Sequence, residues 1–212
     1  MTATADHPRT HGNRRGEGHL LRGEILAAAA ELLDSGGDGR AVTLRAVARR
    51  TGIATTSIYP HFPDRQALVL AVAGQAFAEL SHRLRTADEA GGDARQRLHT
   101  VCRTYLDFAH RHPGRYRLMF AGLGRPIAAV DGEVTTDDPV NAGGEVMRIL
   151  TAALTACAAA GQCTSSDPAA DALALWLGLH GLAHQRAVAA TFRWPADIAQ
   201  RVVVTLARLG AA

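Results

Sequence analysis

A run of hydroxyl side chains is the first feature of this sequence that could do chemistry. Thr55, Thr56 and Ser57 follow one another, and Tyr59 comes two residues later. Short hydroxyl groups can donate and accept hydrogen bonds at the edge of a base, and a phenolic hydroxyl can reach a phosphate. A helix that needed only solubility would more often carry Glu, Lys or Gln there. The run therefore indicates a surface that contacts DNA.

Positive charge is concentrated around this run. Residues 40–65 carry a local net charge of +4, because Asp64 stands against five arginines: Arg40, Arg45, Arg49, Arg50 and Arg65. Residues 66–212 are nearly balanced, with 14 Arg and 13 acids. Each arginine that pairs with a phosphate releases about one counterion. The whole-chain charge of +3 is too small to make the entire surface bind nucleic acid, so the basic face belongs to one segment.

The residues around the run have the order of a helix-turn-helix. Apolar residues at three- and four-residue steps predict a first helix over about 20–35. Thr43 is placed as the N-cap of a short second helix that Gly52 ends, and a third helix is expected over about 54–60. Gly52 permits the turn because it tolerates a positive φ. An ordinary three-helix packing element is the alternative, and the spacing and the local charge favour DNA binding.

The rest of the chain predicts a larger helical domain. Amphipathic stripes follow Asp64, a short segment opens at Pro113, a loop is expected over 122–143, and helices over about 140–161, 168–190 and 196–210. No segment alternates with period two for long enough to predict a strand. The expected fold class is all-α with about nine helices. We divide it into a flexible arm (1–19), a helix-turn-helix domain (20–65) and a C-terminal ligand-binding and dimerisation domain (66–212).

The N-terminal motif resembles the tetracycline-repressor (TetR) family. The resemblance rests on Ile25–Ala29, on the Thr-Leu-Arg-x-Val-Ala of the second helix, and on Ser57 to Arg65. It implies a list of DNA contacts: Thr43, Thr55, Thr56, Ser57, Tyr59 and His61. Arg65 stands where the family usually has a phosphate-binding Lys, which keeps the charge and changes its geometry. Arg45 flanks the same face.

The stretch from Leu175 to Leu182 resembles the Trp-His-Gly subgroup of TetR-like C-terminal domains. That resemblance implies a homodimer formed by the last two long helices, with candidate interface residues Gly178, Gly181, His184, Val202 and Leu206. Candidate ligand contacts are Phe77, Tyr105, Tyr116, Phe120, Trp176 and His180. Plain core packing is an equal alternative for each aromatic residue. An interior or interface role is the alternative for His180, and a solvent-facing side chain for His61.

Other chemistries find little support in the residues. His110 and His112 stand two apart beside Asp107, so their side chains diverge on a helix and a metal site is not expected. The absence of any Lys removes a Walker-type phosphate loop, and no nucleophilic triad is recognisable. We expect no cofactor and no catalysis. Three cysteines without CxxC spacing are interpreted as reduced packing residues.

The sequence predicts a cytoplasmic, non-membrane protein whose partners are a double-stranded DNA operator, a second copy of itself and an unidentified small molecule. Repression released by that ligand is the expected function, with ligand-responsive activation as the alternative. Two rivals remain: an all-α enzyme, and a helical dimerisation protein without an effector. The arm from Arg9 to Arg15 could enter a minor groove or remain an unstructured tail.

Overall fold

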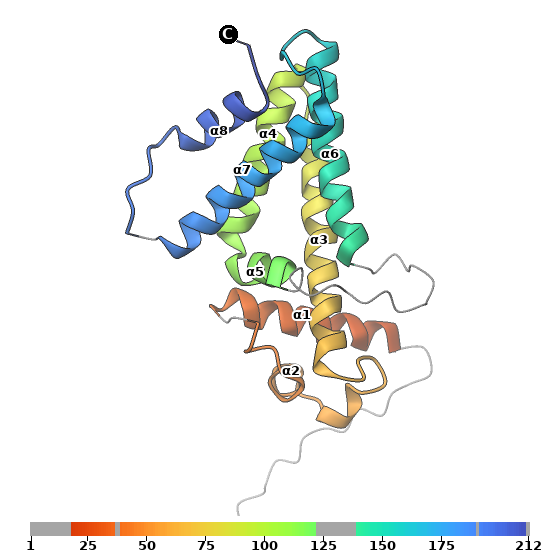
Figure 1. Ribbon diagram of the computed structural model, residues 1–212. Coiled ribbons are helices and arrows are strands. Elements are labelled where there is room, and N and C mark those ends of the chain that lie inside the picture. The colour runs from red at the N-terminus through yellow and green to blue at the C-terminus, as the bar shows by residue number, and fades with distance from the viewer. Residues whose placement is uncertain (1–17, 37–38, 122–138, 190, 211–212) are drawn as a thin grey trace, which may run out of the picture.

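The computed structural model describes residues 18–36, 39–121, 139–189 and 191–210, with the backbone alone over residues 139–142. These residues form α-helices and one 3-10 helix (Figure 1): α1 (Gly18–Asp34), α2 (Leu44–Thr51), η1 (Thr55–Ser57), α3 (Arg65–Glu89), α4 (Ala94–Arg111), α5 (Pro113–Ala121), α6 (Pro139–Ala159), α7 (Pro168–Val188) and α8 (Ile198–Leu206). The all-α class is confirmed. The count is eight α-helices in the described ranges, and it reaches nine only with η1 included. Most of the expected arm (1–17) and of the expected loop (122–138) lies outside these ranges.

Local sequence signals set the ends of the second helix. The Thr43 hydroxyl accepts a 3.1 Å hydrogen bond from the backbone N–H of Ala46, which satisfies one of the unpaired donors at the start of α2. Gly52 ends α2 with φ of 71° and donates its N–H to the carbonyl of Ala48. That left-handed conformation is costly for a residue with a Cβ. The predicted cap and the predicted turn glycine are both confirmed.

The prediction of a third α-helix over about 54–60 is wrong. The structure has the 3-10 helix η1 over three residues, followed by turns in which His61 and Phe62 donate to the carbonyl of Ile58. Hydroxyl and β-branched residues favour helix interiors poorly. Pro60 has no N–H to donate and its ring would clash with the preceding turn. A regular α-helix is therefore not extended here.

Two hydrophobic cores meet along α3. The reader, which we define as α1, α2, η1 and the first turns of α3, is built around buried Ile25, Leu33, Val47, Ile58, Phe62, Leu68 and Val72. The sensor, which we define as the rest of α3 with α4–α8, is built around Leu80, Leu84, Leu98, Leu150, Leu154 and Leu179. The division falls between Ala73 and Ala76 of α3. The boundary expected after residue 65 stays a prediction.

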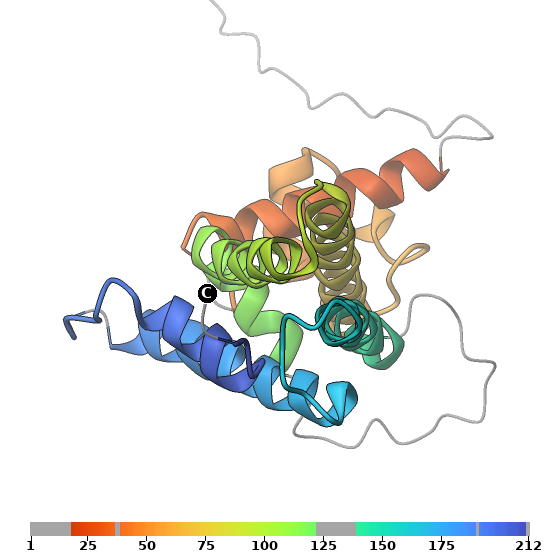
Figure 2. The ribbon, with the colours of Figure 1, turned by 90° about the horizontal axis from the view of Figure 1, so that it is seen from above.

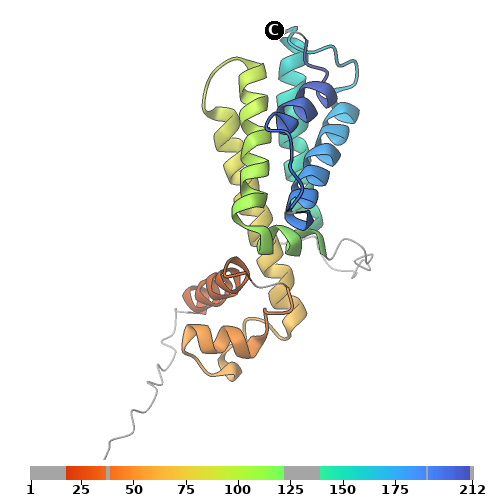
Figure 3. The same ribbon diagram turned by 90° about the vertical axis from the view of Figure 1, so that its left-hand side faces the viewer.

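Helices α3, α4 and α6 pack against one another in the sensor, and α7 runs obliquely across them (Figure 1). Figure 3 shows the reader below, the bundle above, and α3 joining the two. In Figure 2, α4 and α6 flank α3, and α8 lies along α7 at the side of the bundle. No helix within the described ranges is long and apolar enough to cross a membrane.

The three cysteines are free thiols inside or beside the sensor core. Burial raises the pKa of Cys102 to about 12 and that of Cys157 to about 11. Nucleophilic cysteine chemistry needs the thiolate, so these two act as small apolar packing residues.

Candidate nucleic-acid interface and effector site

The hydroxyl run lies on the surface of the reader. Tyr59 is 52% exposed and Thr56 is exposed, whereas Thr55 and Ser57 are half-buried. Ile58 between them is fully buried, and this anchors the turn against the reader core. Ile58 thus holds the run to the reader core, while Thr56 and Tyr59 face solvent.

The arginines beside this run play different roles. Arg45 and Arg49 are exposed on α2, where their charge can face a phosphate. Arg50 instead pairs with Glu31 of α1, with 2.7 Å between Nη2 and Oε2, and this links α2 to α1. His61 is half-buried next to the start of α1, since a Cβ built at Gly18 would lie 3.8 Å from its Cε1 atom.

Arg65 holds the loop that leads into α2. Its Nε donates a 2.8 Å hydrogen bond to the carbonyl of Val42, and its Nη2 donates to the carbonyl of Gly39. The resemblance assigned Arg65 to phosphate binding, and the structure adds this positioning role. Because both acceptors are neutral, the positive charge of Arg65 is not cancelled by them.

All six candidate ligand contacts belong to one aromatic cluster. The members come from four helices: Phe77 from α3, Tyr105 from α4, Tyr116 and Phe120 from α5, and Trp176 and His180 from α7. Ring centroids lie 5.5 Å apart for Phe77 and Phe120, 5.0 Å for Tyr116 and Phe120, and 4.4 Å for Phe120 and His180. Trp176 stacks on His180 at 5.4 Å. The sequence analysis proposed these residues as contacts of one ligand, and the fold brings their side chains together.

A chain of hydrogen bonds runs through the cluster. The Tyr105 and Tyr116 hydroxyls are 2.9 Å apart, and the Tyr116 hydroxyl is 2.8 Å from Nδ1 of His180. Each of the two bonds has one donor and one acceptor if Tyr105 donates to Tyr116 and Tyr116 donates to Nδ1 of a neutral His180. This orientation places the His180 proton on Nε2.

Burial favours the neutral forms of His180, Tyr105 and Tyr116. It lowers the pKa of His180, with the charge of His184 as a second cause, and this favours the neutral imidazole as acceptor. Burial also raises the pKa of Tyr105 to about 12, and it raises the pKa of Tyr116 as well. The cluster is therefore an uncharged polar chain inside an apolar surround, a setting in which an unpaired group is costly.

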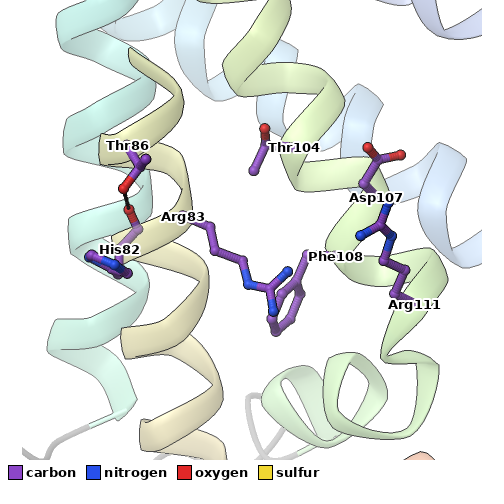
Figure 4. Close-up of a pocket in the computed structure, with 7 residues that line it drawn as sticks. All are labelled: His82, Arg83, Thr86, Thr104, Asp107, Phe108 and Arg111. Carbon is purple, nitrogen blue, oxygen red and sulfur yellow. Dashed lines mark hydrogen bonds between the residues drawn. The ribbon is translucent and has the colours of Figure 1, made fainter. Parts of the chain in front are cut away.

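An open groove lies elsewhere, between α3 and α4 (Figure 4). It has a volume of about 330 Å³ and is lined by His82, Arg83, Thr86, Thr104, Asp107, Phe108 and Arg111. Arg83 crosses it with its guanidinium 5.8 Å from the centre of the Phe108 ring, and it pairs with Glu79 at 2.5 Å. Arg83 is thus already paired with a carboxylate, and Phe108 is buried beneath it. We therefore place the candidate effector site at the aromatic cluster.

The expected dimer residues divide into two groups. A Cβ at Gly178 would lie 3.0 Å from Cγ1 of Val202 and would overlap Leu206, so these three form the α7–α8 contact within one chain. A Cβ at Gly181 would meet no atom within 4 Å, and His184 is exposed. The close approach at Gly178 is therefore explained by the last helix of the same chain. Of the five expected dimer residues, Gly181 and His184 are therefore the two that this α7–α8 contact does not occupy.

Sequence reasoning missed an ion network where the sensor meets the reader. Arg115 of α5 pairs with Asp34 of α1 and with Glu79 of α3. These residues are separated by dozens of positions and follow no motif, so no sequence signal could have found them.

A helix-turn-helix reader joined to an all-helical sensor defines a DNA-binding transcriptional regulator rather than an enzyme. Residues 25–72 match the family described as "Bacterial regulatory proteins, tetR family", and residues 98–209 match "Tetracyclin repressor-like, C-terminal domain". The second match alone covers more than half of the chain. The chain belongs to the TetR family.

The chain is also similar to individual proteins in sequence and in fold. The chain is 31% identical over 131 residues to the HTH-type transcriptional activator FasR of Mycolicibacterium smegmatis, covering 59% of each protein. It spans about half to three fifths of the length of the curated relatives it matches. A protein of unknown function from Rhodococcus sp. RHA1 superposes with a TM-score of 0.74, at 29% identity over 96% of this chain and 98% of the other. FadR from Bacillus subtilis, solved in complex with stearoyl-CoA, has a TM-score of 0.67 over 87% of this chain and 96% of its own, and its 13% identity shows the fold alone.

Proposed function

We propose that this protein is a homodimeric repressor that leaves a near-palindromic operator when a small apolar molecule binds its sensor. The observation that carries the proposal is the exposed face of Thr56 and Tyr59, flanked by the exposed arginines Arg45 and Arg49 on a TetR-family reader. Hydroxyl groups beside guanidinium groups suit base edges and phosphates, respectively. The proposed contacts remain those named from the sequence, including Thr43, Thr55, Ser57, His61 and Arg65.

A stripe on α7 supports the homodimer. Leu173, Leu177 and Val188 are exposed and stand in line with Gly181 and His184, at steps of three and four residues. At a rise of 1.5 Å per residue the stripe extends for about 22 Å along the helix. Isolated exposed apolar residues are ordinary, whereas an aligned stripe marks an association surface. A symmetric dimer through this stripe would place the two readers in successive major grooves, about 34–36 Å apart.

The aromatic cluster is the proposed effector site. Phe120, Trp176 and His180 are half-buried, so they form its accessible edge, while Phe77 and Tyr105 form its buried interior. An apolar molecule that enters here and carries one polar group would compete for the Tyr116–His180 hydrogen bond. The FadR complex with stearoyl-CoA is a precedent for an acyl effector on this fold. Trp176, His180 and Gly181 also carry the resemblance to the Trp-His-Gly subgroup, which stays a proposal.

Ligand-responsive activation is the second candidate, because FasR is an activator. The same reader serves both outcomes, since the position of the operator relative to the promoter decides between them. A dimerisation protein without an effector is the remaining alternative, and it predicts that no compound changes DNA affinity.

Selection of random duplexes by the purified protein tests the proposal directly. We expect one near-palindromic site to be enriched, and compounds with an apolar chain or ring to release it. A ligand can shift the equilibrium only by its difference in affinity between the two conformations. Transcription from a promoter carrying the site then separates repression from activation. Enrichment of no site would contradict the proposed operator binding.

A further inference from the structure

Helix α5 contacts both parts of the molecule. Tyr116 and Phe120 point into the aromatic cluster of the sensor. Leu118, on the same helix, is a member of the reader core, and a Cβ at Gly39 of the reader would lie 3.2 Å from its Cδ1 atom. Helix α5 is therefore the second element, besides α3, that joins the sensor to the reader.

Arg115 adds a polar attachment next to Leu118. Its Nη2 lies 2.7 Å from Oδ2 of Asp34 and its Nε lies 3.0 Å from Oδ1, a two-bond fork on the last residue of α1. Its Nη1 lies 2.6 Å from Oε2 of Glu79 on α3. Nδ1 of His112, the C-cap of α4, lies 2.5 Å from Nη2 of the same guanidinium. One side chain thus connects α1, α3, α4 and α5.

The surroundings of Arg115 make this attachment more rigid than an ordinary surface ion pair. The Arg115 side chain is only 13% exposed, and its two carboxylate partners are about one third exposed. Burial would raise the pKa of Glu79, but hydrogen bonds and charge from Arg83 and Arg115 outweigh it and hold that pKa below its ordinary value. A planar fork fixes orientation as well as distance, which a lysine could not do.

A single helix cannot fix the angle between two bodies, because rotation about and bending of that helix remain possible. Helix α3 is the continuous connection between reader and sensor (Figures 1 and 3). The Arg115–Asp34 fork joins α5 to the end of α1 and not to α3. It therefore opposes rotation and bending of the reader about α3. In a dimer, the angle of each reader sets the distance between the two DNA-binding faces.

We propose that Arg115 is a positioning residue that locks the reader to the sensor and thereby sets the half-site spacing that the dimer accepts. This inference rests on the proposed dimeric operator binding. Arg115 lies at the reader–sensor junction rather than in the DNA-binding face, so its effect is on geometry. Loss of the fork broadens the range of spacings that the dimer tolerates.

The test measures affinity for the selected operator and for versions whose centre is lengthened or shortened by single base pairs. Arg115→Met removes both bonds of the fork, whereas Asp34→Asn removes the carboxylate charge and leaves one acceptor oxygen for Arg115. Arg117→Met is the matched control, because Arg117 is exposed on the same helix. Thermal unfolding of each variant verifies that it folds.

We expect Arg115→Met and Asp34→Asn to lose about tenfold of the wild-type discrimination between spacings, equivalent to about 1.4 kcal/mol. Arg117→Met should behave as wild type. A purely structural role would lower the unfolding midpoint without changing spacing preference. Unchanged discrimination in a folded Arg115→Met or Asp34→Asn protein overturns the inference alone. A wild-type protein that binds no palindromic duplex overturns the proposed function, and the inference with it.

Discussion

The hydroxyl of Tyr116 on α5 lies 2.8 Å from Nδ1 of His180 on α7, and this bond joins the helix that contacts the reader to the helix that carries the proposed dimer stripe. A second bond, between the hydroxyls of Tyr105 and Tyr116, continues from it into the core. Burial lowers the pKa of His180 and so favours the neutral imidazole, which can accept this bond at Nδ1. Its protonation state therefore affects both stability and the proposed effector site.

Acidification should destabilise the protein through His180. Burial lowers its pKa in the folded state below the ordinary value of 6.5, so the unfolded chain binds more protons as the pH falls through that range. The stabilisation is present above about pH 6.5 and is lost progressively below it. Unfolding midpoints of wild type and His180→Asn between about pH 7.5 and 5.5 check this. The unfolding midpoint of His180→Asn should fall less over this pH range than that of wild type. His110→Asn is the control, because His110 is exposed.

Some pH dependence of the unfolding midpoint should remain in both proteins, because burial and the charge of Arg95 also lower the pKa of His99. Equal pH dependence in wild type and His180→Asn would show that His180 is not held neutral by its surroundings.

Two substitutions of Arg65 should separate its role in positioning the loop before α2 from the role of its charge in DNA binding. Arg65→Lys keeps the positive charge but loses the two bonds to the carbonyls of Gly39 and Val42, so we expect a loss of about 1–3 kcal/mol of unfolding free energy with the salt dependence of DNA binding retained. Arg65→Gln should show the same loss of stability and also lower the salt slope by about one counterion. Denaturant unfolding and DNA titrations at several salt concentrations measure both quantities. A lysine variant as stable as wild type would contradict the positioning role.

The two glycines of α7 should respond differently to alanine. Gly178→Ala places a Cβ against Val202 and Leu206, so overpacking should destabilise the chain by about 1–3 kcal/mol. The Cβ added by Gly181→Ala meets no atom of its own chain within 4 Å. Because Ala favours a helix more than Gly does, this variant should stabilise the protomer by up to about 1 kcal/mol. The same Cβ would crowd the proposed dimer stripe. Unfolding and sedimentation at several protein concentrations distinguish the two effects. A Gly181→Ala dimer as tight as wild type would argue against that stripe.

Leu177→Glu should prevent dimerisation without unfolding the protomer. Leu177 is 56% exposed at the middle of the stripe, so a carboxylate there is solvated in the monomer and buried unpaired in the dimer. We expect a folded monomer by sedimentation and a loss of operator binding of at least about tenfold. The exposed Thr155→Glu on α6 is the control. Dimers of Leu177→Glu would place the interface elsewhere.

Sequence reasoning predicted those features that local chemistry determines. Thr43 and Gly52 specify their own caps through one hydroxyl and one positive φ, and the apolar stripes of α3 and α4 specify which faces are buried. The third helix was misjudged because the helix-turn-helix order was followed over 54–60 without weighing the backbone restriction at Pro60. Long-range geometry was beyond prediction: Gly178 looked like a point of approach for a partner, and only the fold shows that Leu206 fills that space.

The same limit applies to the candidate site. Residue types identified Tyr116 and His180 as polar groups among apolar neighbours, but their hydrogen bond depends on how α5 and α7 pack. The Arg115–Asp34 fork joins residues from the sensor and the reader and needed the structure entirely. Sequence-local rules thus describe the DNA-binding face better than they describe the connection behind it.

The most direct test of the account is the binding profile of wild type and of a Thr55→Ala, Thr56→Ala double variant against every single-base change of the selected operator. Each direct base contact is worth about 1–3 kcal/mol of discrimination. We predict that the variant loses discrimination at a few adjacent bases in each half-site and keeps it elsewhere. A variant with the unaltered wild-type profile would contradict the claim that this hydroxyl run reads the DNA.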